Sequence, residues 1–376
     1  MKNTIEKKLN ESKESLIHLS KSIFNDDQDN LKLLVQFFRN HNIHVDKIPY
    51  KDTNALISTS NNKDSPTIIF PFMLYSQNKL LNRWKNSIVT PIIMGAFIGL
   101  HSIEKEINCH LIAIGIPSES SMKSDQLLAY FEGTASCIFI DIAEHTRESG
   151  SSMNFKTIKI QFKDTLFQQG KEKLRFSNPI DAQLSFIHTL NMLKLNISEE
   201  IFIEYKIHEM DIEIFSKPKI ASMTVAISSS NEDWVEEIME ILQDVASKTA
   251  EMLKVKEHIQ LGTTVYHQFH NNDPLNRIFC HNLKEKGFIE ILPYQNTNMG
   301  LHLSHISHKT PCIFPTVGFQ AIPIQNDIHL KQRGIISDES AETIINAANA
   351  YAYTLYDIIH KPELLNEVYA YFQRFN

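Results

Sequence analysis

The order of the expected strands and helices changes twice along this chain of 376 residues. Up to about residue 153, apolar strands such as those at 66–73 and 109–116 alternate with helices, which is typical of a sheet covered by helices. Residues 154–266 show the order strand, helix, strand, strand, helix, strand, which is typical of a small antiparallel sheet with two helices on one face. The first pattern then resumes. We therefore predict a discontinuous, doubly wound α/β domain at 1–153 and 267–376, with an inserted βαββαβ (ferredoxin-like) domain at 154–266.

Local signals predict where several elements begin and end. Pro91 is expected at the start of a helix over residues 91–106, because proline is favoured in the first turn of a helix. Apolar runs predict single strands over residues 137–142 and 312–318. Helical spacing predicts a long terminal helix over residues 337–360.

Composition narrows the class of protein. Hydrophobic residues make up 42% and charged residues 22% of the chain, as in folded globular proteins. The net charge of −7 argues against a nucleic-acid partner, which needs a basic face. No apolar run approaches the roughly 18 residues of a membrane span, and the N-terminal stretch lacks the apolar segment of a signal peptide. We therefore expect a cytoplasmic protein without a membrane partner.

The four cysteines stand singly, without a C-x-x-C pair, so neither a zinc knuckle nor a redox motif is indicated. Cys109 and Cys137 lie in or beside apolar runs. We expect these thiols to be buried and unreactive.

The segment Gly115-Ile-Pro-Ser-Glu-Ser120 follows a buried strand. Its polar residues are expected at the carboxyl end of the sheet, where open α/β sheets bind ligands. Glu119 at that place is a candidate general base, with a pKa raised by partial burial. The alternative is a solvated loop carboxylate without a chemical role.

Two histidines are candidate metal ligands. His145 follows the expected strand over residues 137–142, and His329 precedes the terminal helix. A neutral imidazole at the end of a sheet is well placed to bind zinc. The alternative for each is a surface or hydrogen-bonded histidine.

These features together resemble the peptidase family M20, in particular its amidohydrolase branch of aminoacylases, hippurate hydrolases and aminobenzoyl-glutamate hydrolases. The segment that ends in Glu119 and Ser120 is similar to the family's G-x-P-A-E-E, in which the first Glu is the general base and the second a zinc ligand. The resemblance implies that Glu119 keeps the base and that Ser120 replaces the ligand. It also implies that His145, 26 residues after Glu119, and His329 correspond to metal histidines.

The sequence departs from the family where the other ligands belong. The family's H-x-C-G-H-N, which supplies two zinc ligands, would fall at residues 81–86, where only Asn86 is retained. Arg83 and Lys85 stand in place of the ligating Cys and His, and two cations there repel a zinc ion. The family's histidine in the inserted domain would fall at Gln168.

The resemblance therefore implies an amidohydrolase-type protein that has lost most of its zinc ligands. We expect it to bind a small acyl-amino-acid or peptide-like ligand with little or altered hydrolysis, using the five residues Arg83, Lys85, Asn86, Ser120 and Gln168. Two alternatives stay open: an active metal-dependent amidohydrolase that cleaves an N-acyl amino acid, and a non-catalytic dimeric scaffold.

Cofactor and partner expectations follow from the same resemblance. No cofactor is expected, except zinc if His145 and His329 still bind it. A homodimer is expected through the inserted domain, which would act as a lid and dimerisation domain. If the first motif is misplaced, the ligands should be sought among His267, His270, His302 and His305.

Overall fold

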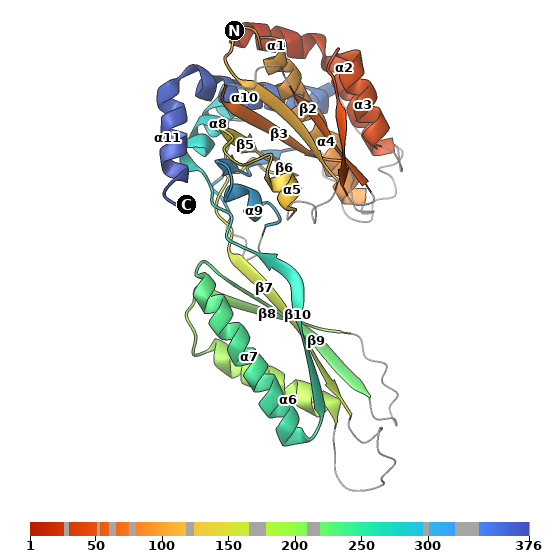
Figure 1. The fold of residues 1–376 in the computed structure, drawn as a ribbon, viewed down its shortest axis with the longest axis vertical. Helices are drawn as coiled ribbons and strands as arrows, with labels where there is room; N and C mark the ends of the chain where they lie inside the picture. The colour runs from red at the N-terminus through yellow and green to blue at the C-terminus, as the bar shows by residue number, and fades with distance from the viewer. Residues whose placement is uncertain are drawn as a thin grey trace. The chain divides into compact units, whose positions relative to one another are not determined.

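The computed structural model describes residues 1–25, 30–50, 53–59, 65–74, 80–117, 124–164, 178–208, 219–295, 301–319 and 338–375. The chain forms two compact units (Figure 1). Unit 1 comprises Met1–Ser151, His270–Asn296 and His305–Asn376, and unit 2 comprises Ser152–Phe269 and Thr297–Ser304. The sequence predicts the inserted unit at 154–266. No described helix is both long and apolar enough to cross a bilayer.

The main sheet of unit 1 has the strand order β1-β2-β4-β3-β5-β11. Its strands are β1 (Asp46–Tyr50), β2 (Thr53–Thr59), β3 (Thr67–Met73), β4 (His110–Ile116), β5 (Ser136–Ile138) and β11 (Cys312–Ile313). β3, β4, β5 and β11 are parallel, whereas β1 and β2 pair antiparallel at one edge, so the sheet is mixed. A second, two-stranded parallel sheet pairs β6 (Asp141–Ala143) with β12 (Thr316–Gly318). The expectation of an α/β fold with a parallel sheet is confirmed.

Helices from both ends of the chain enclose the core of unit 1. The described helices that lie in unit 1, with only Ser304 of α9 assigned to unit 2, are α1 (Lys2–Glu11), α2 (Lys13–Asn25), α3 (Asn30–Asn40), α4 (Leu80–His101), α5 (Asp125–Leu128), α8 (Asp273–Glu285), α9 (Ser304–Ser307), α10 (Asp338–His360) and α11 (Pro362–Phe372). α4 packs on β3 and on α1, α2 and α10, and α10 also packs on α8. Phe70 of β3 contacts Phe97 of α4 edge-on at 5.2 Å between ring centroids and stacks on Tyr351 of α10 at 5.6 Å. These aromatic contacts join the first third of the chain to its last helices.

Three predicted boundaries are wrong. α4 begins at Leu80, so Pro91 lies inside a 22-residue helix rather than at its start. The burial of Trp84 and Ile88 stabilises the earlier turns, which offsets the hydrogen bond that proline cannot donate. The strands expected over 137–142 and 312–318 are each divided in two, as β5 and β6 and as β11 and β12. Pro315 lies in the gap between β11 and β12 and has no N–H for the ladder.

Unit 2 follows the order β7, α6, β8, β9, α7, β10. These elements are β7 (Asn154–Lys163), α6 (Pro179–Lys194), β8 (Ile201–Ile207), β9 (Ile220–Ser229), α7 (Glu232–Leu253) and β10 (Lys256–Tyr266). The antiparallel sheet has the order β10-β7-β9-β8, and both helices pack on it. Alternate residues such as Ile158, Ile160 and Phe162 of β7 are buried in the core shared with the helices. Asn178 and Asn231 cap the two helices by accepting hydrogen bonds from backbone N–H groups.

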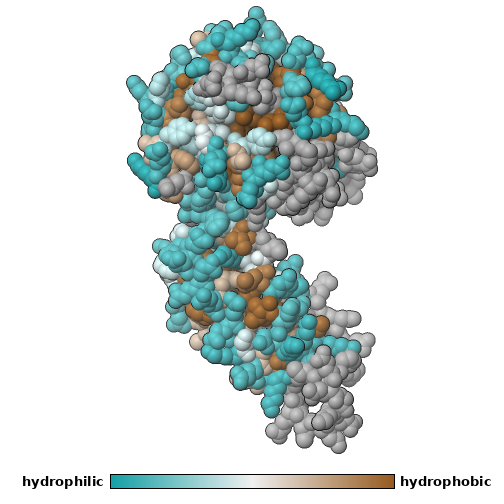
Figure 2. Space-filling view, in the orientation of Figure 1, coloured by the Kyte–Doolittle hydropathy of each residue, from teal (hydrophilic) through white to brown (hydrophobic). Residues whose placement is uncertain are grey.

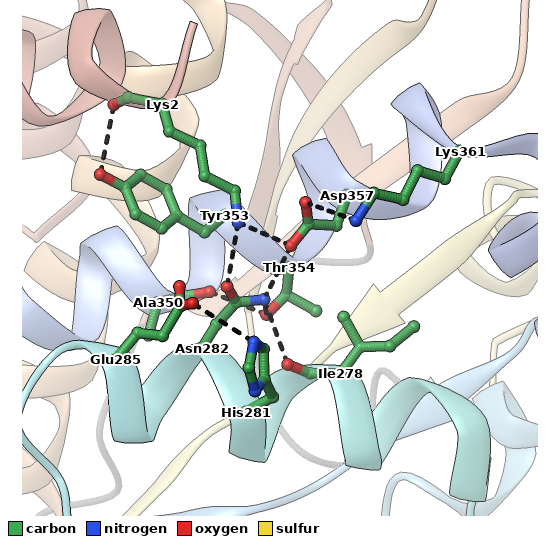
Figure 3. A network of polar contacts seen from close by, with 10 residues as sticks. All are labelled: Lys2, Ile278, His281, Asn282, Glu285, Ala350, Tyr353, Thr354, Asp357 and Lys361. Atoms are coloured by element: carbon green, nitrogen blue, oxygen red, sulfur yellow. Dashed lines mark hydrogen bonds and ion pairs between the residues drawn. The ribbon is translucent and has the colours of Figure 1, made fainter.

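A buried polar network ties the N-terminal residues of unit 1 to its last helices (Figure 3). The carboxylate of Asp357 on α10 accepts hydrogen bonds from Lys2 Nζ at 2.8 Å and from Asn282 Nδ2 of α8 at 3.2 Å. Asn282 also donates to Thr354 Oγ1 at 3.2 Å. Asp357 and Asn282 are both buried, so their polar groups need partners inside the protein, and this network supplies them.

We expect Asp357→Asn to lower the free energy of unfolding by about 1–3 kcal/mol, because a buried charge-assisted network loses its anion. Urea unfolding followed by circular dichroism measures the change. Glu367→Gln is the matched control, since Glu367 pairs with Arg277 on the exposed surface of the same unit; its effect should stay below about 1 kcal/mol. Equal losses in the two variants would contradict a stabilising role for the network.

Candidate functional site

The carboxyl ends of β3 and β4 lie together in unit 1. Leu74 N, directly after β3, donates a hydrogen bond to Ile116 O at the end of β4, with a length of 2.8 Å. Gly115 permits this close approach, since an added Cβ would lie 2.8 Å from the side chain of Leu74. This is the sheet end at which ligand binding is expected. Glu119 and Ser120, which follow β4, lie outside the described residues, as do Gln168 and His329.

An ion pair between α4 and β6 is the best-defined polar feature among the predicted site residues. Lys85 Nζ lies 2.6 Å from Asp141 Oδ1 and 2.8 Å from Asp141 Oδ2. The two side chains retain 30% and 33% of their exposure, so the pair is half-buried. An ammonium group has three N–H donors, and the two short contacts leave Lys85 one donor for a further acceptor.

Arg83 and Asn86 share the first turns of α4 with Lys85, and both are half-buried. Positions two apart on an α-helix do not face each other, whereas positions three apart do. Arg83 and Asn86 therefore share one side of α4, and Lys85 points toward β6 in a different direction. Arg83 and Lys85 therefore have different surroundings.

His145 lies in the turn that follows β6, and its side chain is exposed. The neighbouring Thr146 Oγ1 accepts a hydrogen bond from Gly318 N of β12 at 2.9 Å. A Cβ at Gly318 would lie 2.8 Å from Thr146 N, so only glycine allows the turn to approach the strand this closely. The turn that carries His145 is therefore fixed against the second sheet.

Three of the four histidines expected as alternative ligands, His267, His270 and His302, have defined contacts. In unit 2, His267 Nδ1 lies 3.4 Å from Glu232 Oε1, and the ring of His302 lies within hydrogen-bonding distance of Tyr266 Oη, at 3.0 Å. In unit 1, the ring of His270 lies 4.3 Å from that of His308 and 4.8 Å from that of Phe375, between centroids. Burial, followed by the nearby His308, lowers the pKa of His270 to about 4.

Within the described ranges, no three His, Cys, Asp or Glu side chains are grouped so that they could hold a metal ion. The residues described around Asp141 do not fit a zinc ion, because Lys85 contacts both oxygens of that carboxylate and brings its own positive charge. Sequence reasoning missed Asp141 as a site residue. Its only signal was its place at the end of an apolar run, three residues before Glu144 and four before His145 in the chain.

Comparison with known proteins gives fold relatives only. No family model matches the sequence, and no curated protein matches it. Among solved structures, the YxeP protein of Bacillus subtilis, named as a dinuclear metal-binding peptidase of the M20 family, matches with a TM-score of 0.66 at 12% identity, over 92% of this chain and 99% of that one. An aminobenzoyl-glutamate utilization protein from Klebsiella pneumoniae matches with a TM-score of 0.65 at 9% identity, over 93% and 98% of the two chains.

The aminopeptidase PepT of Bacillus cereus is a third such structure, with a TM-score of 0.62 at 13% identity over 92% of this chain and 99% of that one. The resemblance to the M20 family that the sequence predicts is thereby confirmed for the fold. Identities this low do not carry an activity from those proteins to this chain.

We expect the stability of unit 1 to fall as the pH drops from 7.5 to 5, because the folded state keeps His270 neutral while the unfolded chain protonates it near pH 6.5. The stabilisation is fully present above pH 6.5 and is lost as the pH falls toward the folded pKa of about 4. Urea unfolding at both pH values should show that His270→Phe removes about 1–2 kcal/mol of this loss. His18→Phe, at an exposed position of α2, is the control and should leave the pH dependence unchanged. A wild-type pH dependence in His270→Phe would contradict the assignment.

Proposed function

We propose that this protein binds a small acyl-amino-acid or peptide-like ligand at the carboxyl end of the unit 1 sheet, and hydrolyses it slowly or not at all. The observation that carries the proposal is the ion pair of Lys85 with Asp141. Lys85 would then hold a positively charged ammonium group at the place where the family resemblance predicts zinc ligands. The names of the fold relatives, a peptidase and an aminobenzoyl-glutamate utilization protein, support this class of ligand.

The chemistry of recognition follows from the donors at this place. The remaining N–H of Lys85 can donate to a ligand carboxylate or amide oxygen, and a half-buried charge-assisted hydrogen bond is stronger than a neutral one. Asp141 holds the ammonium group in one position, so little side-chain entropy is lost when a ligand binds. Asn86, the next residue of α4, can supply a further donor, whereas Arg83 lies on a different side of the helix from Lys85.

The same pair argues against efficient hydrolysis. Cleavage of an amide in the metallopeptidases needs a metal that lowers the pKa of its bound water and polarises the carbonyl. An ammonium group paired with Asp141 cannot generate that nucleophile. Glu119 would then be a general base without an activated water to deprotonate.

We expect N-benzoylglycine or N-acetyl amino acids to raise the melting temperature saturably, by about 2–4 °C at ten times the dissociation constant. Lys85→Met should weaken this binding by about tenfold or more, since a charge-assisted hydrogen bond is lost. Lys105→Met, at an exposed position of unit 1, is the matched control. The double variant Lys85→Met with Asp141→Leu removes the unpaired carboxylate and tests whether lost folding explains the result.

Two results would contradict the proposal. No saturable shift with any of these compounds would favour the scaffold alternative. Two equivalents of zinc in the purified protein, together with an amidase activity that Glu119→Gln abolishes, would favour the active metal-dependent amidohydrolase.

We further propose that the protein forms a homodimer through unit 2. Three hydrophobic residues lie along one stripe of α6 and its C-terminus: Leu184, Met192 and Leu195, which are 57%, 51% and 78% exposed. Figure 2 shows hydrophobic side chains among hydrophilic ones on the visible surface of unit 2. A second copy would bury such a stripe with twofold symmetry.

Light scattering at micromolar concentration should therefore give the mass of two chains, and Leu184→Glu with Met192→Glu should reduce it to one. The matched control is Met252→Glu with Leu261→Glu, because these residues of unit 2 are 66% and 58% exposed on other elements. A monomeric mass for the unaltered protein, or dissociation by the control alone, would contradict this interface.

A further inference from the structure

The two faces of the unit 2 sheet differ in their chemistry. The face that packs on α6 and α7 is apolar. The strand residues that alternate with these buried ones form the opposite face, which we call the open face. Its members include Lys159, Gln161 and Lys163 of β7, Ser222 and Thr224 of β9, Glu204 and Lys206 of β8, and Lys256, His258 and Gln260 of β10.

Positive charge gathers on the open face although the whole chain carries a net charge of −7. Four lysines lie on it, against the single acidic side chain of Glu204. Lys206 and Lys256 are exposed, and Lys159 and Lys163 are half-buried. None of the four forms an ion pair within the described part of the chain, whereas Lys156, on the helix side of β7, pairs with Glu236 of α7.

The strand register brings these cations together. Lys256 lies directly opposite Lys163 across the β10–β7 pair. Like charges at directly opposed positions destabilise a sheet unless an anion lies between them. On a second row, Lys206 is opposite Thr224, Thr224 is opposite Lys159, and Lys159 is opposite Gln260. Lys206 and Lys159 therefore lie on either side of Thr224 in one row across the sheet.

We propose that the open face of unit 2 binds an acidic, extended segment of a partner protein. Lys159 and Lys206 are two strands apart, or about 10 Å. Carboxylates three residues apart in an extended chain are separated by about the same distance. The opposed pair Lys163 and Lys256 can share one carboxylate, and the serine, threonine and glutamine side chains between the cations can hydrogen-bond to the backbone of the segment.

The face suits a protein segment better than a nucleic acid. Single-stranded nucleic acids bind to aromatic platforms on which their bases stack. The aromatic side chains Phe155 and Phe202 of the open face both lie opposite Ser228 at one end of the strands. The rows that carry the lysines present Gln161, Ser222 and Thr224 between them, without an aromatic ring. Specific duplex binders neutralise more phosphates than four lysines reach, and arginine is their usual base-reading residue.

The test uses the full chain and fluorescently labelled poly-L-glutamate, with single-stranded polyuridylate of matched charge as a second probe. We expect saturable binding of polyglutamate that weakens as salt rises, because the contacts are exposed charges. Lys159→Gln with Lys206→Gln should weaken it about three- to tenfold. Lys248→Gln with Lys284→Gln removes the same charge from α7 and α8 and is the matched control; it should change binding less than about twofold.

Circular dichroism checks that both double variants are folded. No saturable binding of polyglutamate, or an equal loss in the two double variants, would overturn the proposal. Tighter binding of polyuridylate than of polyglutamate would overturn the choice of a protein partner. The ligand-induced melting shift assigned to Lys85 is a separate readout, so failure of either proposal leaves the other standing.

Discussion

Unit 1 depends on a parallel pairing between two segments that lie on either side of unit 2 in the chain. Cys137 of β5 pairs with Cys312 of β11, and Tyr351 of α10 donates a hydrogen bond to Ile138 O at 2.7 Å. All of these side chains are buried, and burial raises the pKa of the Cys137 thiol and of the Tyr351 phenol. Until the chain returns from unit 2, β5 has an unpaired edge and the core lacks α8 and α10.

The pairing between chain segments before and after unit 2 also positions the proposed site. Asp141 begins β6, which is held by pairing with β12 in the segment that follows β11. The carboxylate that Lys85 contacts is therefore in place only when both halves of unit 1 have assembled. The stability of the discontinuous unit and the geometry of the Lys85–Asp141 ion pair therefore rest on one set of strand pairings.

Unit 2 is built on a different principle. Its core is local, because β7 to β10 and both helices come from one continuous stretch of chain. Only one face of its sheet is needed for that core, so the residues of the other face are free to vary without loss of packing. In this chain that face is cationic, and α6 carries exposed hydrophobic side chains. Neither feature contributes to the core of unit 2.

The sequence by itself determined the elements whose signal is periodic. The alternation at Ile158, Ile160 and Phe162 and the helical spacing of α7 predict the order of unit 2, and the buried run before Gly115 predicts β4. A period of two or 3.6 residues is local and can be read directly. The start of α4 could not be read in this way, because the burial of Trp84 outweighed the local preference of Pro91 for the first turn of a helix.

Only the tertiary structure decided which side chains meet. Lys85 was singled out from the sequence as a cation in place of a zinc ligand, but its partner Asp141, 56 residues away, was not. The opposed Lys163 and Lys256 likewise required the register of β7 and β10. Local patterns state which face a residue occupies, whereas ion pairs and strand registers depend on packing between distant segments, and that packing is settled by the free energy of the whole fold.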